Sequence, residues 1–193
     1  ARTCPAGAIR MSDEGRREID WRRCDQCLQC VEACLYGALD RSGETKTVES
    51  VLEEVLRDRL FYKNSGGGVT VSGGEPLIQT DFVAELLKAA KAAGLHTAVD
   101  TTGYVTGASM AAVSPWTDLM LWDIKHLDSR THEEATGVPN QRILENLKQA
   151  AKGVKIWLRI PLIRGFNDSI EHMDQVLDLA RAGEGHREHL AVG

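Results

Sequence analysis

Five cysteines lie in the first 34 residues of this 193-residue chain, and their spacing points to one kind of chemistry. Cys24, Cys27 and Cys30 are separated by gaps of two residues, and Cys34 follows after three more. Gaps of two residues let one tight loop present three thiolates to a 4Fe–4S cluster, while the fourth cysteine of such a run ligates a neighbouring cluster. The spacing therefore predicts a cluster whose fourth thiolate comes from elsewhere in the chain.

Cys4 is the candidate for that fourth thiolate. It is followed by Pro5, and bacterial ferredoxin runs end in Cys-Pro. Residues 4–9 (CPAGAI) and 34–39 (CLYGAL) are also similar, as in the two halves of a ferredoxin, although Leu35 stands where the pattern has proline. We expect one complete cluster on Cys4, Cys24, Cys27 and Cys30. Cys34 is then left to bind a second cluster, whose other ligands would precede the chain.

Zinc binding and buried structural cysteines are the alternatives. Zinc sites usually combine paired Cys-x-x-Cys elements rather than three thiols at successive two-residue gaps. Disulfides are rare in cytosolic proteins. The spacing therefore favours iron–sulfur binding.

The overall composition is that of a globular protein. Hydrophobic residues make up 42% of the chain, charged residues 26%, and the net charge is −5. The sequence has no stripe of basic residues, so we do not expect nucleic acid as a partner. No apolar run is long enough to span a bilayer and no secretory leader is recognisable, so we expect no membrane partner and a cytoplasmic location.

The pattern changes after residue 44. Residues 1–44 contain every cysteine and few apolar stretches, so hydrophobic burial alone cannot order them. Residues 45–193 alternate between helical and strand periodicities, and residues 189–193 read like the start of a further strand. We predict two domains with these boundaries. The expected helices cover 47–61, 81–93, 108–113, 143–151 and 170–182, and the expected strands cover 69–72, 96–100, 118–123 and 155–163.

Repeated strand–helix units with short connections predict an α/β fold with a parallel sheet. In such folds, functional groups gather at the carboxyl ends of the strands. Polar segments follow four of the predicted strands, at 73–75, 100–102, 123–125 and 164–168. We therefore expect these four segments to form one site.

Taken with the cysteines, four later motifs form a familiar series. Ser72–Leu77 (SGGEPL), Asp100–Gly103 (DTTG), Asp123–His126 (DIKH) and Arg159–Asp168 (RIPLIRGFND) follow in that order. The series resembles the radical S-adenosylmethionine (SAM) activating enzymes of glycyl radical enzymes, the pyruvate formate-lyase activase family, in the branch with a ferredoxin-like insert. The resemblance covers nearly the whole chain. It implies a partial (β/α)6 radical SAM barrel preceded by a ferredoxin-like 4Fe–4S insert.

The resemblance also implies an oxidoreductase activity. One electron from a 4Fe–4S cluster cleaves SAM to methionine and a 5′-deoxyadenosyl radical, which abstracts hydrogen from a glycine of the partner enzyme. The implied partners are a glycyl radical enzyme, as protein substrate, and a flavodoxin or ferredoxin-type electron donor. The motifs leave open which glycyl radical enzyme is activated.

Carried over by match, the Gly73-Gly74-Glu75 motif would bind the methionyl amino group. Asp123-Ile124-Lys125 resembles the Asp-x-Lys element beside the methionyl moiety, in which the lysine pairs with the carboxylate. Arg159 is similarly placed to contact that carboxylate end. Ordinary ion pairing by Lys125 and Arg159 is the alternative.

Asp100, Thr101 and Asp123 resemble a monovalent-cation site next to the cofactor, and hard oxygen ligands suit such an ion. The two aspartates are equally compatible with capping the helices that follow them.

Two family features are missing from this sequence. The Cys-x-x-x-Cys-x-x-Cys loop, whose three thiolates leave one iron open to SAM, is absent, and so is the late histidine used near the ribose; His186 and His189 read as surface residues. We expect the chain to be the middle portion of an activase, with no catalytic residue of its own and unable to cleave SAM alone. The alternatives are an electron-transfer module fused to an inactive barrel, and a peptide-modifying radical enzyme with auxiliary clusters.

Overall fold

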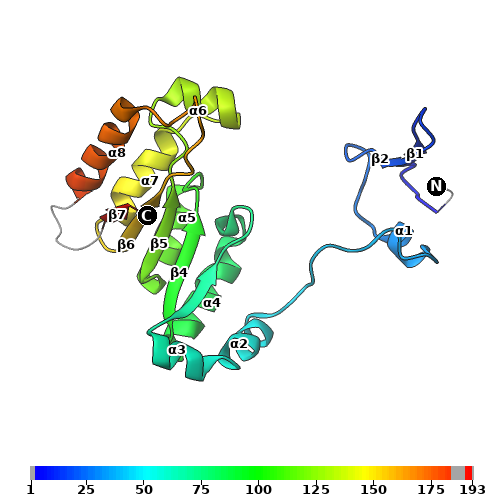
Figure 1. Cartoon of the computed structure of the whole chain (residues 1–193). Helices are drawn as coiled ribbons and strands as arrows, with labels where there is room; N and C mark the ends of the chain where they lie inside the picture. Colours follow the sequence, from blue (N-terminus) through cyan, green and yellow to red (C-terminus); the bar gives the residue numbers. More distant parts are fainter. Residues whose placement is uncertain (1–2, 184–189, 193) are drawn as a thin grey trace. The chain divides into compact units, whose positions relative to one another are not determined.

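A computed structural model describes residues 3–183 and 190–192 of the chain (Figure 1). The chain divides into two compact units, Ala1–Lys46 and Thr47–Gly193. We refer to them as the cysteine unit and the sheet unit and describe each by itself.

The cysteine unit contains little regular structure. An antiparallel hairpin joins β1 (Ile9–Met11) to β2 (Arg17–Ile19), and α1 (Gln29–Glu32) is a single turn of helix. Among the described residues of this unit only Ala8 is buried. The sequence indicated that this segment could not form a hydrophobic core, and its burial agrees with that expectation.

The sheet unit is built on five parallel strands that lie in chain order. They are β3 (Gly68–Val71), β4 (His96–Thr101), β5 (Leu119–Asp123), β6 (Lys155–Arg159) and β7 (Leu190–Val192). The α/β class and the parallel sheet expected from the sequence are confirmed. Because all strands point the same way, the residues that end β3, β4, β5 and β6 share one edge of the sheet.

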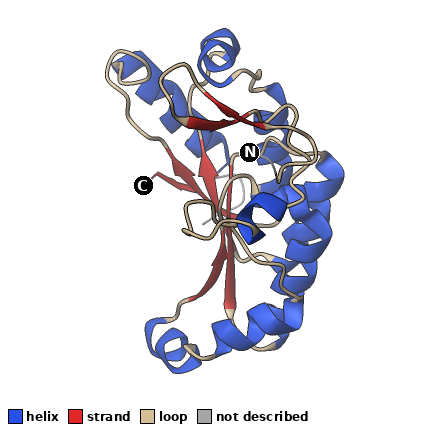
Figure 2. Cartoon of the chain, turned by 90° about the vertical axis from the view of Figure 1, so that its right-hand side faces the viewer, coloured by secondary structure: helices blue, strands red, loops and turns tan. Residues whose placement is uncertain are grey.

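Helices connect and flank these strands (Figure 2). Within the described ranges, none of them has both the length and the apolar character needed to cross a membrane. The connecting helices, including two short 3₁₀ turns, are α2 (Val48–Leu56), α3 (Arg59–Ser65), η1 (Pro76–Gln79), α4 (Thr80–Ala92), α5 (Gly107–Val113), η2 (Ser114–Trp116), α6 (Ser129–Thr136), α7 (Gln141–Ala150) and α8 (Ile170–Gly183).

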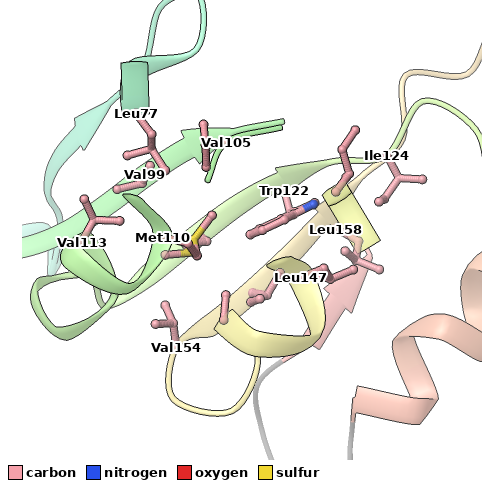
Figure 3. Close-up of a cluster of buried hydrophobic side chains, with 14 of the residues drawn as sticks. Leu77, Val99, Val105, Met110, Val113, Trp122, Ile124, Leu147, Val154 and Leu158 are labelled. Atoms are coloured by element: carbon pink, nitrogen blue, oxygen red, sulfur yellow. The ribbon is translucent and has the colours of Figure 1, made fainter. Parts of the chain in front are cut away.

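The core lies on one face of the sheet (Figure 3). Burial alternates along β5 and β6, where Met120, Trp122, Ile156 and Leu158 are fully buried and their sequence neighbours are more exposed. Gly103, which follows β4, packs so closely on this core that an added Cβ would come within 2.1 Å of the Trp122 ring. The buried face therefore fixes the loop after β4, and the opposite face carries the polar residues described below.

Two predicted elements differ in extent from the observed ones. The helix expected over 47–61 breaks at Asp58, a residue type that favours helix ends over helix interiors, and α3 begins directly after it. The strand expected over 155–163 ends at Arg159, because Pro161 has no N–H to offer a neighbouring strand.

Helix α6 was missed in the sequence, although its end signals are present. Asp128 precedes the helix and its side chain accepts a hydrogen bond from the Thr131 N–H, while Gly137 ends it with φ +81°. The strand indicated over 189–193 corresponds to β7. The predicted surface positions of His186 and His189 lie outside the described residues.

Candidate active site

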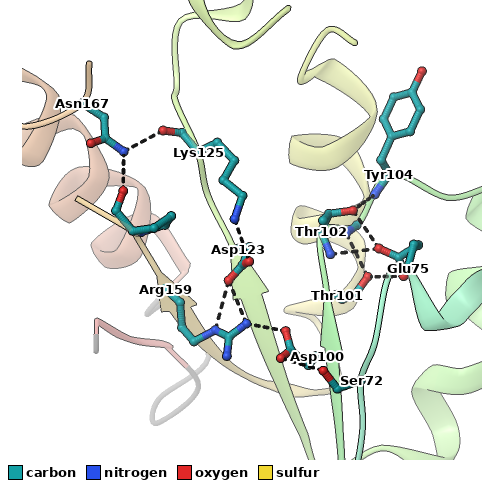
Figure 4. Close-up of polar contacts among 12 residues, drawn as sticks. Ser72, Glu75, Asp100, Thr101, Thr102, Tyr104, Asp123, Lys125, Arg159 and Asn167 are labelled. Atoms are coloured by element: carbon teal, nitrogen blue, oxygen red, sulfur yellow. Dashed lines mark hydrogen bonds and ion pairs between the residues drawn. The ribbon is translucent and has the colours of Figure 1, made fainter. Parts of the chain in front are cut away.

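The ends of β3, β4, β5 and β6 bring most of the predicted site residues into one group (Figure 4). Asp123 and Arg159 are direct neighbours in the β5–β6 register, and Asp100 ends the same face of β4. The side chains of these three residues and of Lys125 remain 21–37% exposed. The group is therefore both ordered by the sheet and accessible to a ligand.

Arg159 links two carboxylates. Its Nε donates to Asp123 Oδ1 over 3.0 Å, and its Nη2 lies 2.9 Å from the same oxygen and also donates to Asp100 Oδ1. Lys125 Nζ lies 2.9 Å from Asp123 Oδ2, and Ser72 donates to Asp100 Oδ2 over 3.1 Å. Two carboxylates and two cations thus balance in formal charge, and charge-assisted hydrogen bonds hold them in place.

Glu75 is fixed on the neighbouring strand end. Its Oε1 accepts from Thr101 Oγ1 over 2.8 Å and from the Leu77 N–H over 3.2 Å. Its Oε2 accepts from the N–H and the hydroxyl of Thr102 over 3.0 and 2.7 Å. A carboxylate has about four acceptor positions, and these four contacts use them. Glu75 therefore attaches the turn after β3 firmly to the end of β4.

That turn is open to its surroundings. Gly73 has φ +136°, a conformation that L side chains rarely adopt, and no atom would contact a Cβ added at Gly73 or Gly74. Both glycines are exposed. Their backbone carbonyls are accordingly available to accept hydrogen bonds from a ligand.

Two predicted residues do not present their side chains to this group. Thr101 is 2% exposed and bonds to Glu75, on the opposite face of β4 from Asp100. Ile124 is 2% exposed and belongs to the hydrophobic core, while its N–H donates to the Arg159 carbonyl over 2.9 Å. Ser72 and Thr102 lie inside the predicted motifs, but the sequence assigned them no role; in the structure Ser72 bonds to Asp100 and Thr102 bonds to Glu75.

In the cysteine unit, the four cysteines predicted to share a cluster line one cavity of about 540 Å³. Apolar side chains, among them Trp21 and Val31, complete its wall. The intervening residues Gln26 and Leu28 have φ of +56° and +61°, which is uncommon for non-glycine residues. Such strained backbone is frequent where a loop has a function, and here it curves the cysteine loop around the cavity. The four cysteines are Cys4, Cys24, Cys27 and Cys30.

Cys34 does not line this cavity, but its loop repeats the loop of Cys4. Ala8 N–H donates to Cys4 Sγ over 3.3 Å, and Ala38 N–H donates to Cys34 Sγ over 3.2 Å. Gly7 and Gly37 occupy equivalent positions with φ +58° and +60°. The sequence similarity of 4–9 and 34–39 thus corresponds to two turns of the same geometry.

The pKa values of Cys27 and Cys34 are shifted in opposite directions. All five cysteines lie in the described part of the chain and are free. Backbone N–H groups, that of Leu39 foremost, lower the pKa of Cys34. The Gln29 N–H lowers the pKa of Cys27, but the Asp25 carboxylate, burial and the nearby Cys4 together outweigh it and raise that pKa overall. Within the described residues, no three His, Cys, Asp or Glu side chains converge closely enough to hold a single metal ion.

Comparison with known proteins adds independent information. The family model of the radical SAM superfamily matches residues 22–180. The isethionate sulfite-lyase activating enzyme of Nitratidesulfovibrio vulgaris is 44% identical over 182 residues, covering 92% of this chain and 59% of that protein. The (2S)-3-sulfopropanediol dehydratase activating enzyme of Klebsiella oxytoca is 40% identical over 178 residues, covering 91% and 56%. The chain thus spans somewhat more than half the length of these relatives.

Solved structures agree in fold. A domain of pyruvate-formate lyase-activating enzyme from Bacteroides vulgatus aligns with a TM-score of 0.52 at 28% identity, covering 66% of this chain and 99% of that one. Streptococcus suis SuiB aligns with a TM-score of 0.58 at 21% identity, covering 73% and 32%, and shows likeness of fold alone. The resemblance to activating enzymes inferred from the motifs is confirmed, and the chain belongs to the radical SAM superfamily.

Proposed function

We propose that this chain is the SAM-binding part of an activating enzyme that installs a glycyl radical on a partner enzyme. The observation that carries the proposal is the charged group at the ends of β4, β5 and β6, beside the open glycine turn after β3. Relatives 36–44% identical to the chain are named activating enzymes, which favours this function over an electron-transfer module.

When bound beside a reduced 4Fe–4S cluster, SAM supplies the radical chemistry of this superfamily. The residues of this chain fit the methionyl end of that molecule. Only one of the three N–H groups of Lys125 has a partner among the described residues, which leaves two for a carboxylate. Arg159 lies next to it through their shared partner Asp123. The two cations are therefore proposed to bind the ligand carboxylate together.

The ammonium group of the same ligand needs acceptors. Gly73 and Gly74 offer exposed carbonyls, whereas the acceptor positions of Glu75 are already used by Leu77, Thr101 and Thr102. We therefore assign the ammonium contact to the glycine carbonyls, and to Glu75 the task of holding the turn in place.

We propose that Asp100, Thr101 and Asp123 can bind a monovalent cation only after their present side-chain contacts change. Arg159 already bridges the two aspartates, and the Thr101 hydroxyl is directed to Glu75. A cation would have to bind after Arg159 turns toward a ligand, using the carboxylate oxygens that it releases.

We also propose that the cysteine unit is a ferredoxin-like insert and that the unit from residue 45 onward is part of a radical SAM barrel. The cavity lined by four cysteines supports one auxiliary cluster, because a 4Fe–4S cluster takes four thiolates. The repeated turn supports a second cluster at Cys34. A flavodoxin or ferredoxin-type protein would supply electrons, and free thiols suit the reducing cytoplasm.

Calorimetric titration of the iron-reconstituted chain with SAM tests this function. We expect binding, and we expect Lys125→Ala to weaken it about tenfold or more, which corresponds to about 1.4 kcal/mol. Lys152→Ala is the matched control: it removes an exposed lysine whose ammonium, within the described ranges, bonds to Gln149 alone. If the chain fails to bind SAM, or if both variants bind like the wild type, the proposed function is wrong.

The partner is addressed by a separate binding measurement. Isethionate sulfite-lyase is the first candidate, since its activating enzyme is 44% identical to the chain. We expect the chain to bind this enzyme more tightly than 4-hydroxyphenylacetate decarboxylase, whose activating enzyme is 36% identical.

A further inference from the structure

The loop that carries Lys125 has a buried support that the site described so far does not use. After β5 ends at Asp123, the backbone leaves the sheet and its carbonyls lose their strand partners. Three buried side chains bind the backbone of this loop: Asn140 and Asn167 donate to its carbonyls, and His172 accepts from one of its N–H groups. They are 3%, 1% and 4% exposed. A buried carbonyl without a partner costs about 1–3 kcal/mol, so this support determines where the loop can lie.

Asn167 makes the most informative of these contacts (Figure 4). Its Nδ2 donates to the Lys125 carbonyl over 2.9 Å and to the Pro161 carbonyl over 3.0 Å. Its Oδ1 accepts from the Ile163 N–H over 2.7 Å, which fixes the orientation of the amide. One side chain thus joins the backbone of Lys125 to the segment that begins two residues after Arg159.

Asn140 and His172 hold the rest of the loop. Asn140 donates to the carbonyls of His126 and Leu127 over 3.0 and 2.8 Å. His172 Nε2 accepts from the Leu127 N–H over 3.2 Å, and its ring lies 4.4 Å from that of His126. Burial, with the neighbouring His126, lowers the pKa of His172, which keeps Nε2 available as an acceptor.

The position of this backbone matters because lysine is a long, flexible side chain whose reach starts at its Cα. Fixing the Lys125 backbone relative to the end of β6 fixes the distance between the ammonium of Lys125 and the guanidinium of Arg159. Recognition of one carboxylate by two cations depends on that distance, and small displacements of positioning groups have large effects on ligand geometry.

We infer that Asn167 is a positioning residue for the site: its amide joins the Lys125 backbone to the chain following Arg159 and so sets the spacing of the two cations. Asn140 and His172 complete this support of residues 125–127. The inference rests on the proposed carboxylate-binding role of Lys125 and Arg159, and it adds the group that aligns them.

The sequence offers a closely matched control. Asn146 is also buried, at 6% exposure, and its Nδ2 also bridges two backbone carbonyls, those of Gly103 and Val105, each over 2.9 Å. Asn146→Ala therefore removes the same kind of bridge from a loop that does not carry Lys125. We expect both alanine variants to be destabilised by loss of such a bridge, and only Asn167→Ala to change the environment of Lys125.

The first measurement is the NMR signal of Lys125 in the ¹³C-dimethylated chain, assigned by its loss in Lys125→Arg. In Asn167→Ala we expect this signal to sharpen and to move to the position of exposed lysines such as Lys152. We expect Asn146→Ala to leave it in place. An unchanged Lys125 signal in Asn167→Ala, or an equal change in Asn146→Ala, overturns the inference. Should Asn167→Ala not fold, Asn167→Ser retains one donor and is expected to give a smaller shift in the same direction.

The second measurement is a double-mutant cycle for SAM affinity. We expect Asn167→Ala to weaken binding about tenfold in the wild-type background and to have no further effect in Lys125→Ala. Equal losses in both backgrounds mean that Asn167 does not act through Lys125, which overturns the inference. If the NMR signal changes as expected but Lys125→Ala binds SAM normally, the positioning stands and the proposed role of Lys125 in ligand binding is wrong.

Discussion

The two units of this chain differ in how much apolar surface they bury. In the sheet unit, a continuous core from Leu77 to Ala180 packs against one face of the strands. In the cysteine unit, Ala8 is the one buried side chain among the described residues, and Trp21 is 70% exposed. The first unit holds its shape by burial of apolar surface, whereas the second has a cavity lined by thiols in the place where a core would be.

The charged groups differ in the same way. The sheet unit balances Asp100 and Asp123 with its own Lys125 and Arg159. The thiols of the cysteine unit are free, and the partner that we propose for them is an iron–sulfur cluster. We therefore expect the site on the sheet to be ordered before its ligand binds, and the proposed cysteine site to become ordered together with its cluster.

The largest effect is expected from removing the proposed cluster. After iron chelation, or in Cys24→Ser, we expect amide hydrogen-exchange protection to be lost through residues 3–46, because Ala8 is the one buried residue described in this unit. The sheet unit should keep its thermal midpoint. Exchange mass spectrometry distinguishes the two units within one sample.

Cys34→Ser serves as the control for this experiment. Cys34 does not line the cavity, so the variant should retain one cluster and the protection of the cysteine loop. Protection that persists throughout the cysteine unit without iron would show that this unit, like the sheet unit, is ordered without an inorganic group.

The reverse experiment destabilises the sheet unit alone. Gly103→Ala places a methyl group within 2.1 Å of the Trp122 ring at a residue with φ +73°. We expect a loss of about 3 kcal/mol and a fall of about 10 °C in the midpoint of this unit, measured by calorimetry. Iron content per cysteine unit should not change. Gly153→Ala, where nothing lies within 4 Å and φ is not positive, is the matched substitution and should be nearly neutral.

The next largest effect is expected from removing Arg159, the cation that Asp100 and Asp123 share. Arg159→Leu leaves the mostly buried carboxylates of Asp100 and Asp123, which are 22% and 21% exposed, without their shared cation, and we expect a loss of about 1–2 kcal/mol. Potassium chloride should restore part of this stability, whereas tetramethylammonium chloride, whose cation is too large for the gap, should not. Thermal midpoints in the two salts measure the difference. A wild-type protein that already distinguishes the salts would mean that a cation binds there alongside Arg159.

The order of strands and polar motifs along the chain was enough to predict where the site lies on the sheet. Strand ends in parallel sheets meet at one edge, so the polar motifs after β4, β5 and β6 indicated a shared site without any coordinates. It could not predict which partners these side chains would choose. Arg159 and Lys125 both reach Asp123, and only the register of β5 against β6 brings Asp123 and Arg159 side by side.

Contacts between residues far apart in the chain could not be predicted from the sequence either. Asn167 was read as part of a motif after β6, but its bond to the Lys125 carbonyl spans 42 residues. Strand alternation predicts that Thr101 and Asp100 lie on opposite faces of β4. It does not predict that Thr101 bonds to Glu75, because the turn after β3 sets the position of Glu75. Spacing within one loop is easier to interpret because the residues are local: Cys24, Cys27 and Cys30 line one cavity, and the cluster that their spacing predicts stays a prediction.

The smallest effect concerns the opposite edge of the sheet, where a charged pair has a structural role only. Asp118 accepts from Lys91 and from the N–H and hydroxyl of Thr97, over 3.0 and 3.1 Å for Thr97. Burial by itself raises the pKa of Asp118, but the hydrogen bonds from Lys91 and Thr97 outweigh it and leave the pKa below its ordinary value. Because the folded state binds the proton less well, the stabilisation is fully present above the ordinary pKa near 3.8 and is lost as pH falls through the lower folded value.

Asp118→Asn isolates this contribution. Both side chains are about one-third exposed, so we expect a loss below about 1 kcal/mol at pH 7. Urea unfolding of the two proteins from pH 7 down to pH 3 should show this difference shrinking only below about pH 4, because the wild type then loses the charge that the variant lacks. SAM affinity should be unchanged, since Asp118 precedes β5 and the site lies where β5 ends. A weaker affinity in Asp118→Asn would show that the two edges of the sheet are coupled and that the site is less independent of the core than its geometry indicates.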